Sequence, residues 1–259
     1  MTHFFLKKIK PLFFTVLYFL FLSQHLYSQK NDFKGKEISF PSIDSLEITA
    51  DLYLTDQESS TYIILCHQAY FSRGAYRSIA PKLNELGYHC LAIDQRSGYK
   101  VEGIKNKTCK KASKANKPRK YKDAIPDVEA ALLYAKKELK AKKIILWGSS
   151  YSASIVIYLG SKYPNEIDGI MSFSPGEYFT INDQKISSFA NKVTCPVFVT
   201  SAKKEQKKWN NIYNQISSKK SYFLPSKGGF HGSKTLWPKK KGNEVYWKSV
   251  RDFLATIKN

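Results

Sequence analysis

The sequence contains few residues of the kinds that bind metals or build disulfide frameworks. Its 259 residues include four cysteines and five histidines, and no CxxC pair or His/Cys cluster has metal-ligand spacing. We therefore expect neither a metal site nor a cofactor. Cys66, Cys90 and Cys195 each lie in or beside an apolar run, so free, buried thiols are expected there. The state of Cys109, in a lysine-rich segment, is left open, because the spacing selects no disulfide pairing.

Linkers and repeats are also missing. No Gly/Ser-rich or Pro-rich stretch divides the chain, and no repeat with a period of about 20 to 50 residues is visible. The length and a hydrophobic content of 42% suit one large α/β domain with a real core. We predict a single domain over residues 29–259.

The apolar run near the N-terminus, residues 11–22, is too short for a membrane span, which needs about 20 residues. It follows Lys7, Lys8 and Lys10 and precedes a more polar stretch, the layout of a secretory signal peptide. Cleavage after Ser28 fits this layout, and cleavage after Gln29 is the alternative. We predict a signal peptide over residues 1–28 and an exported protein, periplasmic or secreted, with no permanent membrane span.

Acidic residues are half as frequent as basic ones. The chain has 21 Asp and Glu against 42 Lys and Arg, a formal net charge of +21. The surplus is concentrated in residues 100–122, 203–208 and 239–241. Attraction to an anionic surface or polymer is one interpretation, and a solvated basic face is the other. No nucleic-acid motif accompanies the charge, so we expect weak association with anionic envelope polymers at most and no specific nucleic-acid binding.

Short β-branched and aromatic runs alternate with helical patterns along the rest of the chain. Strands are expected at residues 37–40, 46–54, 62–66, 88–94, 143–147, 170–173, 197–200 and 221–224. Helices are expected at residues 76–86, 123–139, 151–162 and 244–257. This alternation is typical of βαβ units, and it predicts an α/β fold with a mostly parallel central sheet flanked by helices. The first two strands are close enough to pair antiparallel, and residues 100–122 are expected to form a loop.

Residues 144–156, IILWGSSYSASIV, carry the most information about function. An apolar strand, a Gly/Ser turn and a helix follow one another directly. This pattern resembles the nucleophile elbow of the α/β-hydrolase superfamily, G-x-S-x-G, with Ser152 in place of the second glycine. The elbow presents a serine hydroxyl above the sheet at a helix N-terminus. The spacing from Gly148 favours Ser150 as nucleophile over its neighbour Ser149.

The resemblance implies a histidine and an acid after the nucleophile, in that fold's chain order of serine, acid, histidine. Of the five histidines, only His231 follows Ser150, and it comes after the last expected strand. Glu205 follows the strand at residues 197–200, where the family commonly has its acid. Glu177, after the preceding strand, is the alternative acid.

An acyl-transfer site also needs amide donors for an oxyanion. By the same resemblance, Tyr151 would supply one backbone amide, and Ala69 or Gln68 the other, from the turn that begins at His67. His67 itself is expected to organise this turn rather than to take part in the chemistry. The sequence lacks the HGGG motif of the hormone-sensitive-lipase branch.

The turn DQRSG at residues 94–98 is similar to one in dienelactone-hydrolase-like members of the superfamily. Only about 20 residues separate the strands near 173 and 194, which predicts a minimal cap or none and an open site with Tyr178 and Phe179 as substrate contacts. The resemblance implies a serine hydrolase, and a carboxylesterase that acts through an acyl-serine is the leading hypothesis. A serine peptidase, an acyltransferase and a non-catalytic polyanion-binding envelope protein are the alternatives.

Overall fold

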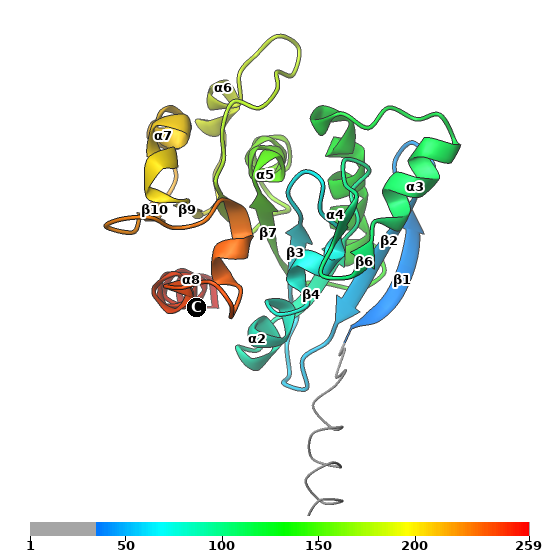
Figure 1. Ribbon diagram of the computed structural model, residues 1–259, viewed down its shortest axis with the longest axis horizontal. Coiled ribbons are helices and arrows are strands. Elements are labelled where there is room, and N and C mark those ends of the chain that lie inside the picture. The colour runs from blue at the N-terminus through cyan, green and yellow to red at the C-terminus, as the bar shows by residue number, and fades with distance from the viewer. Residues whose placement is uncertain (1–34, 259) are drawn as a thin grey trace, which may run out of the picture. The chain divides into compact units, whose positions relative to one another are not determined.

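A computed structural model describes residues 35–258 of the chain (Figure 1). The predicted signal peptide lies outside the described residues. Within them, no helix is both long and apolar enough to cross a membrane.

The described residues form an eight-stranded sheet with the order β1-β2-β4-β3-β7-β8-β9-β10. The strands are β1 (Lys36–Pro41), β2 (Glu47–Tyr53), β3 (Thr61–Cys66), β4 (His89–Ile93), β7 (Lys143–Ser149), β8 (Gly169–Phe173), β9 (Val197–Thr200) and β10 (Lys220–Phe223). The pairs β1/β2 and β2/β4 are antiparallel, and all other neighbours are parallel. The predicted strands and the antiparallel start are confirmed, with bounds that differ by one or two residues.

Helices cover both faces of the sheet. The α-helices are α2 (Ala80–Glu85), α3 (Lys107–Lys114), α4 (Ile125–Lys137), α5 (Tyr151–Lys162), α6 (Ser187–Ala190), α7 (Gln206–Gln215) and α8 (Asn243–Lys258). Residues of α3, α4, α5 and α7 pack with one set of strand side chains, and residues of α2 and α8 with the alternate set. Successive strand residues face opposite sides of the sheet, and helices cover both sides. The central strands are therefore apolar throughout.

The lysine-rich segment is not the loop that the sequence led us to expect. Residues 100–105 form a small hairpin of β5 (Lys100–Val101) and β6 (Ile104–Lys105), and α3 follows. Asn106 caps α3, since its side chain accepts the amide of Cys109 at 2.7 Å. Only Thr108 and Ala112 of this helix are buried, so its lysines conceal the apolar pattern that would predict it.

Three further helical details differ from expectation. The helix expected at residues 76–86 is divided into a 3-10 turn at Arg73–Tyr76 and the short α2, which begins beside Pro81. Helices α6 and α7 were not predicted, and α7 buries only Trp209 and Ile212 among polar residues. Between β8 and β9 the chain forms only the short α6 (Figure 1), so the expectation of no cap domain is confirmed.

All four cysteines are free. Cys66, Cys90 and Cys195 are buried, as expected, and burial raises the pKa of each thiol. Cys109, which the sequence left open, is partly exposed.

The junction of β7 and α5 is the closest approach of a strand and a helix near the predicted nucleophile. A Cβ added at Gly148 would overlap the backbone carbonyl of Ser152, in the first turn of α5. Because backbone atoms cannot move aside as a flexible side chain can, only glycine fits at this position.

We expect Gly148→Ala to lower the free energy of unfolding by about 3 kcal/mol, through overpacking against a backbone carbonyl. Urea unfolding followed by tryptophan fluorescence measures this. Gly103→Ala is the control: its φ of +78° strains an alanine, but no atom lies within 4 Å of the added Cβ, so a loss of about 1 kcal/mol is expected. Equal losses in the two variants would contradict the close approach.

Candidate active site

Ser150 occupies the turn between β7 and α5 in a conformation that non-glycine residues rarely adopt. Its φ is +62° and its ψ is −125°, a strain of about 1 to 3 kcal/mol of the kind concentrated at functional sites. Its amide donates to the carbonyl of Phe173 at 2.8 Å. Ser149 instead ends β7, and its Oγ accepts the amide of Ser233 at 2.9 Å. The backbone strain therefore falls on Ser150 and not on the rival serine.

Ser152 has a structural role where the superfamily pattern has its second glycine. Its Oγ accepts the amide of Ser149 at 2.9 Å and lies 2.8 to 2.9 Å from the carbonyls of Cys66, His67 and Ser149. The hydroxyl therefore joins the nucleophile turn to the end of β3, a function that glycine could not provide.

His231 is paired with Glu205. Its Nδ1 lies 2.6 Å from Oε1 of the carboxylate, whose Oε2 accepts the hydroxyl of Ser174 at 2.8 Å and the amide of Ala202 at 3.2 Å. Burial raises the pKa of Glu205. The hydrogen bond and the charge of His231 lower this pKa, as do the bonds from Ser174 and Ala202, and the net pKa is below its ordinary value. The carboxylate is thus held ionised beside the imidazole.

Hydrogen bonds hold the loop that carries His231 against the nucleophile turn and the ends of the neighbouring strands. Besides the bond between Ser149 and Ser233, the amide of Gly232 donates to Oγ of Ser174 at 2.8 Å, and the indole of Trp147 donates to Oγ of Ser233 at 2.8 Å. A Cβ at Gly232 would overlap Oγ of Ser149. The structure therefore brings the turn containing Ser150, the imidazole loop and Glu205 to the same end of the parallel strands.

Glu177, the alternative acid, lies in a different set of contacts. Its carboxylate accepts the amides of Ile186 and Ser187 at 2.6 and 3.0 Å, so it fixes the segment around α6. Of the two candidates, the structure brings only Glu205 to His231.

His67 organises the turn after β3. Its Nδ1 donates to the carbonyl of Gln68 at 2.8 Å, because Nε2 accepts the backbone amide of Gln95 at 3.0 Å and must be unprotonated. Asn106 also contacts Nε2, at 3.1 Å. Burial lowers the pKa of His67 to about 4, against a smaller opposing effect of the Gln68 bond. This ring is a neutral connector between β3, β4 and α3.

The predicted oxyanion donors come from two segments, the start of α5 and the turn after β3. Tyr151 is the first residue of α5, where backbone amides have no partner within the helix. Gln68 and Ala69 follow His67, whose carbonyl faces Ser152. The Oε1 atom of Gln68 is buried without a hydrogen-bond partner among the described residues, and it lies beside Gly232. The turn therefore approaches the imidazole loop closely.

Tyr178 lies beside the candidate nucleophile, and Phe179 packs partly buried against the core. The hydroxyl of Tyr178 donates to the carbonyl of Ser174 at 3.0 Å. Burial raises the pKa of Tyr178, and a hydrogen bond with the side chain of Ser150 lowers it by a smaller amount. Of the two predicted substrate contacts, Tyr178 is the one whose hydroxyl is held at the site, by its bond to Ser174.

Two residues of the site were missed by sequence reasoning. Ser174, at a φ of +57°, binds both Glu205 and Gly232. Tyr121 stacks on Tyr151, with ring centroids 4.8 Å apart. The small residues that follow β8 could have pointed to Ser174, but no pattern in the lysine-rich segment marks Tyr121.

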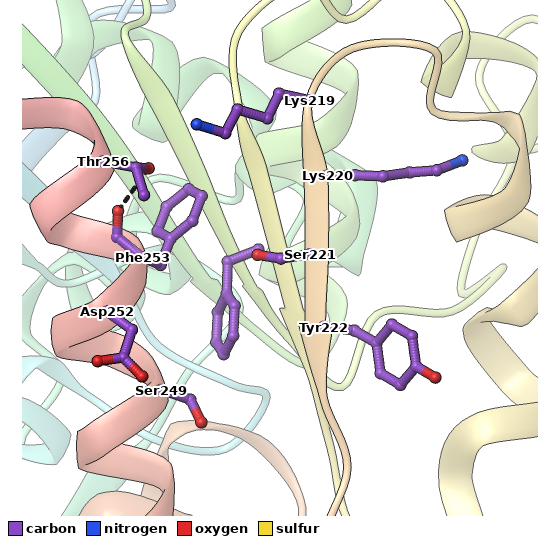
Figure 2. A pocket seen from close by; sticks show the side chains of 9 residues that line it. Lys219, Lys220, Ser221, Tyr222, Ser249, Asp252, Phe253 and Thr256 are labelled. Atoms are coloured by element: carbon purple, nitrogen blue, oxygen red, sulfur yellow. Dashed lines mark hydrogen bonds between the residues drawn. The ribbon is translucent and has the colours of Figure 1, made fainter.

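A hollow elsewhere on the molecule does not belong to this site. Figure 2 shows it between β10 and α8, with Ser221, Asp252 and Phe253 in its lining. Its volume is about 300 Å³. None of the candidate site residues lines it. Residues 35–258 contain no group of three His, Cys, Asp or Glu side chains that could hold a metal ion.

The Glu205–His231 pair should make stability depend on pH. Because the pKa of Glu205 is below its ordinary 4.5 in the folded protein, the ionised carboxylate contributes stability that is complete above that value and is lost as the pH falls through the folded value. We expect the difference in unfolding free energy between the native protein and Glu205→Gln to be constant near neutral pH and to shrink below about pH 4.5. Denaturant titrations from pH 7 to pH 3 measure it.

A double-mutant cycle supplies the control for this prediction. In a His231→Gln background, Glu205→Gln should have a smaller effect at neutral pH, because the imidazole supplies the leading contributions that lower the pKa of Glu205. A difference that stays the same at every pH would show that the carboxylate is not held ionised by the fold.

Comparisons with known proteins bear on the fold and the family of the chain. The family model of serine aminopeptidase, S33, matches residues 57–223, more than half of the chain. No curated protein sequence matches. Dienelactone hydrolase from Anabaena variabilis is similar with a TM-score of 0.67, at 12% identity over 86% of this chain and 99% of that one. The esterase Pf2001 from Pyrococcus furiosus has a TM-score of 0.67, at 16% identity over 98% of each chain.

A third similar structure is Est1E from Butyrivibrio proteoclasticus, solved with ferulic acid bound. Its TM-score is 0.63, at 15% identity over 85% of this chain and 98% of that one. Similarity at such low identity establishes the fold, and the family match establishes the relationship. The chain therefore has the α/β-hydrolase fold and belongs to the serine aminopeptidase S33 family of hydrolases.

Proposed function

We propose that the chain is an exported serine hydrolase that cleaves carboxylic esters through an acyl-serine intermediate on Ser150. The observation that carries the proposal is the strained backbone of Ser150, at φ +62° and ψ −125°, at the head of α5. Such a turn exposes a hydroxyl above the strand ends at a helix N-terminus, where developing negative charge is favoured.

His231 is the general base in this proposal, and Glu205 orients it. With Nδ1 bonded to Glu205, the other ring nitrogen is free to take the proton of Ser150 as its oxygen attacks the ester carbonyl. Within residues 35–258 the hydroxyl of Ser150 forms no hydrogen bond with His231, whose Nδ1 is bonded to Glu205. We infer that the hydroxyl turns toward the imidazole when substrate binds, since catalytic hydrogen bonds often tighten only in the complex.

The oxyanion of the tetrahedral intermediate would be bound by backbone amides. Tyr151 supplies one amide at the start of α5, and Ala69 or Gln68 supplies the second from the turn that His67 holds. Collapse of the intermediate transfers the proton from His231 to the departing alcohol, and a water activated by the same imidazole then releases the acid.

The charge around the site favours an ester over an aminopeptidase substrate. The family description raises an aminopeptidase as the second candidate, and such an enzyme needs a free carboxylate for the substrate's α-ammonium group. Glu205 and Glu177 are both engaged, by His231 and by the amides of the α6 segment. A groove beside Ala69 is lined by Arg119 and Lys120, whose charges would repel a cation.

Export and polyanion association belong to the proposal on sequence grounds alone. The basic and apolar layout of residues 1–28 supports a signal peptide, and the lysine-rich residues 100–122 support weak attachment to anionic envelope polymers. An acyltransferase on the same three residues, or a catalytically idle polyanion-binding protein, are the competing functions.

A fluorophosphonate probe tests the nucleophile. The native protein should be labelled covalently, and Ser150→Ala should abolish the labelling and lower kcat/KM for 4-nitrophenyl acetate by about 10³-fold or more. His231→Ala should have a comparable effect on kcat/KM, because the hydroxyl then has no base.

Ser149→Ala distinguishes the two adjacent serines. It removes the rival hydroxyl but keeps the strained residue, so the probe should still label Ser150. Labelling that survives Ser150→Ala would show that Ser150 is not the nucleophile. Turnover of 4-nitrophenyl acetate and of alanyl-4-nitroanilide, each divided by its uncatalysed rate, separates an esterase from a peptidase.

A further inference from the structure

A groove of about 450 Å³ adjoins the candidate site on the side of the lysine-rich segment. We call it the basic groove: it is lined by residues 69–70 after β3, by residues 96–98 after β4, and by residues 117–121 and Cys109 of the lysine-rich segment. Ala69, one of the proposed oxyanion donors, thus lines the groove, two residues after His67, whose carbonyl lies 2.9 Å from the hydroxyl of Ser152.

Tyr121 connects the basic groove to the nucleophile. Its ring stacks on that of Tyr151, with centroids 4.8 Å apart, and meets Tyr178 edge-on at 6.4 Å. Tyr151 directly follows Ser150, and the hydroxyl of Tyr178 is bonded to the carbonyl of Ser174. A substrate whose carbonyl lies at Ser150 can therefore extend past Ala69 and Tyr121 into the groove.

The charges of the groove divide into a neutralised pair and a free pair. Arg96 is bonded to Asp44 at 2.8 Å and to Asp127 at 2.6 Å, and Lys117 lies 3.2 Å from Asp44. In residues 35–258 the side chains of Arg119 and Lys120 form no ion pair, and Arg119 contacts only the sulfur of Cys109, at 3.7 Å. Two uncompensated cations in a groove attract an anion.

The backbone that carries this free pair is fixed. The buried hydroxyl of Ser97 lies 3.0 Å from the carbonyl of Arg119 and 2.6 Å from that of Lys120, and the amide of Lys120 donates to Asp123 at 2.6 Å. Only the two side chains need to be ordered when a ligand binds, which lowers the entropic cost of recognition.

We propose that the basic groove binds an anionic group on the substrate, so that the preferred substrates are esters with a carboxylate near the scissile bond. The guanidinium of Arg119 can bind a carboxylate with two parallel hydrogen bonds, and Lys120 adds a point charge. The proposal rests on the ester hydrolysis proposed above and names the substrate class of that site.

Matched esters test the charge preference. One pair places the charge on the acyl side, the anionic 4-nitrophenyl monoester of adipic acid against its neutral methyl ester. A second pair places it on the alcohol side, 3-carboxyphenyl acetate against 3-carbamoylphenyl acetate. We expect kcat/KM for the anionic member of one pair to exceed that of the neutral member by about tenfold at low salt, and the ratio to fall as salt screens the contact.

The ratio should depend on the free pair of cations and not on net charge. Each charge removed should lower the ratio of the two kcat/KM values by about threefold. Arg119→Gln combined with Lys120→Gln should therefore reduce this ratio to about twofold or less. Lys110→Gln combined with Lys114→Gln is the matched control. It removes the same charge from exposed positions of α3 outside the groove lining, and it should leave the ratio unchanged.

The outcomes separate the two proposals. If both members of each pair are hydrolysed at equal kcat/KM, or if the ratio survives the Arg119→Gln, Lys120→Gln double substitution, the groove does not recognise the anionic group. The proposed ester hydrolysis is unaffected by either result. Hydrolysis of no ester, with no labelling of Ser150, overturns the proposed function and the groove's role with it. The pair that shows the preference identifies which side of the scissile bond enters the groove.

Discussion

The hydroxyl of Ser152 lies within hydrogen-bond reach of the Ser149 amide and of the carbonyls that end β3, and the rest of the site depends on this contact. The chain must turn from β7 into α5 at a single residue, and the strain of that turn falls on Ser150. Holding a non-glycine residue there costs about 1 to 3 kcal/mol. The bonds of Ser152 and the absence of a side chain at Gly148 keep the turn closed against this cost.

The scarcity of acidic residues has a structural consequence at the edge of the site. Two buried arginines bind several of the few carboxylates: Arg73 pairs with Asp51 and Asp94, and Arg96 with Asp44 and Asp127. Removing one partner of such a buried pair leaves an uncompensated charge, at a cost of about 3 to 5 kcal/mol. These carboxylates are therefore committed to holding β2, β4 and α4 together, and they are not available to Arg119 and Lys120.

Sequence reasoning located the strands well because those in the middle of the sheet are buried on both faces and read as apolar runs. It missed α3 and α7, whose apolar positions are few and separated by lysines. It proposed Ser150 and His231 from spacing and chain order, and it left Glu205 and Glu177 as alternatives, because both follow a parallel strand. Only the path of each loop decides which carboxylate meets the imidazole, and that path depends on long-range contacts that no local pattern encodes.

Ser174 shows how the acid and the base are kept in register. A hydroxyl has one hydrogen to donate and can accept others; here it donates to Glu205 and accepts the amide of Gly232, the residue after His231. The carboxylate and the imidazole loop therefore share one anchor at the end of β8, which is itself paired with β7 beneath Ser150. Because a displacement of either group would break a bond to the other's support, their relative orientation is set before substrate arrives, and it need not be reorganised when charge develops in the reaction.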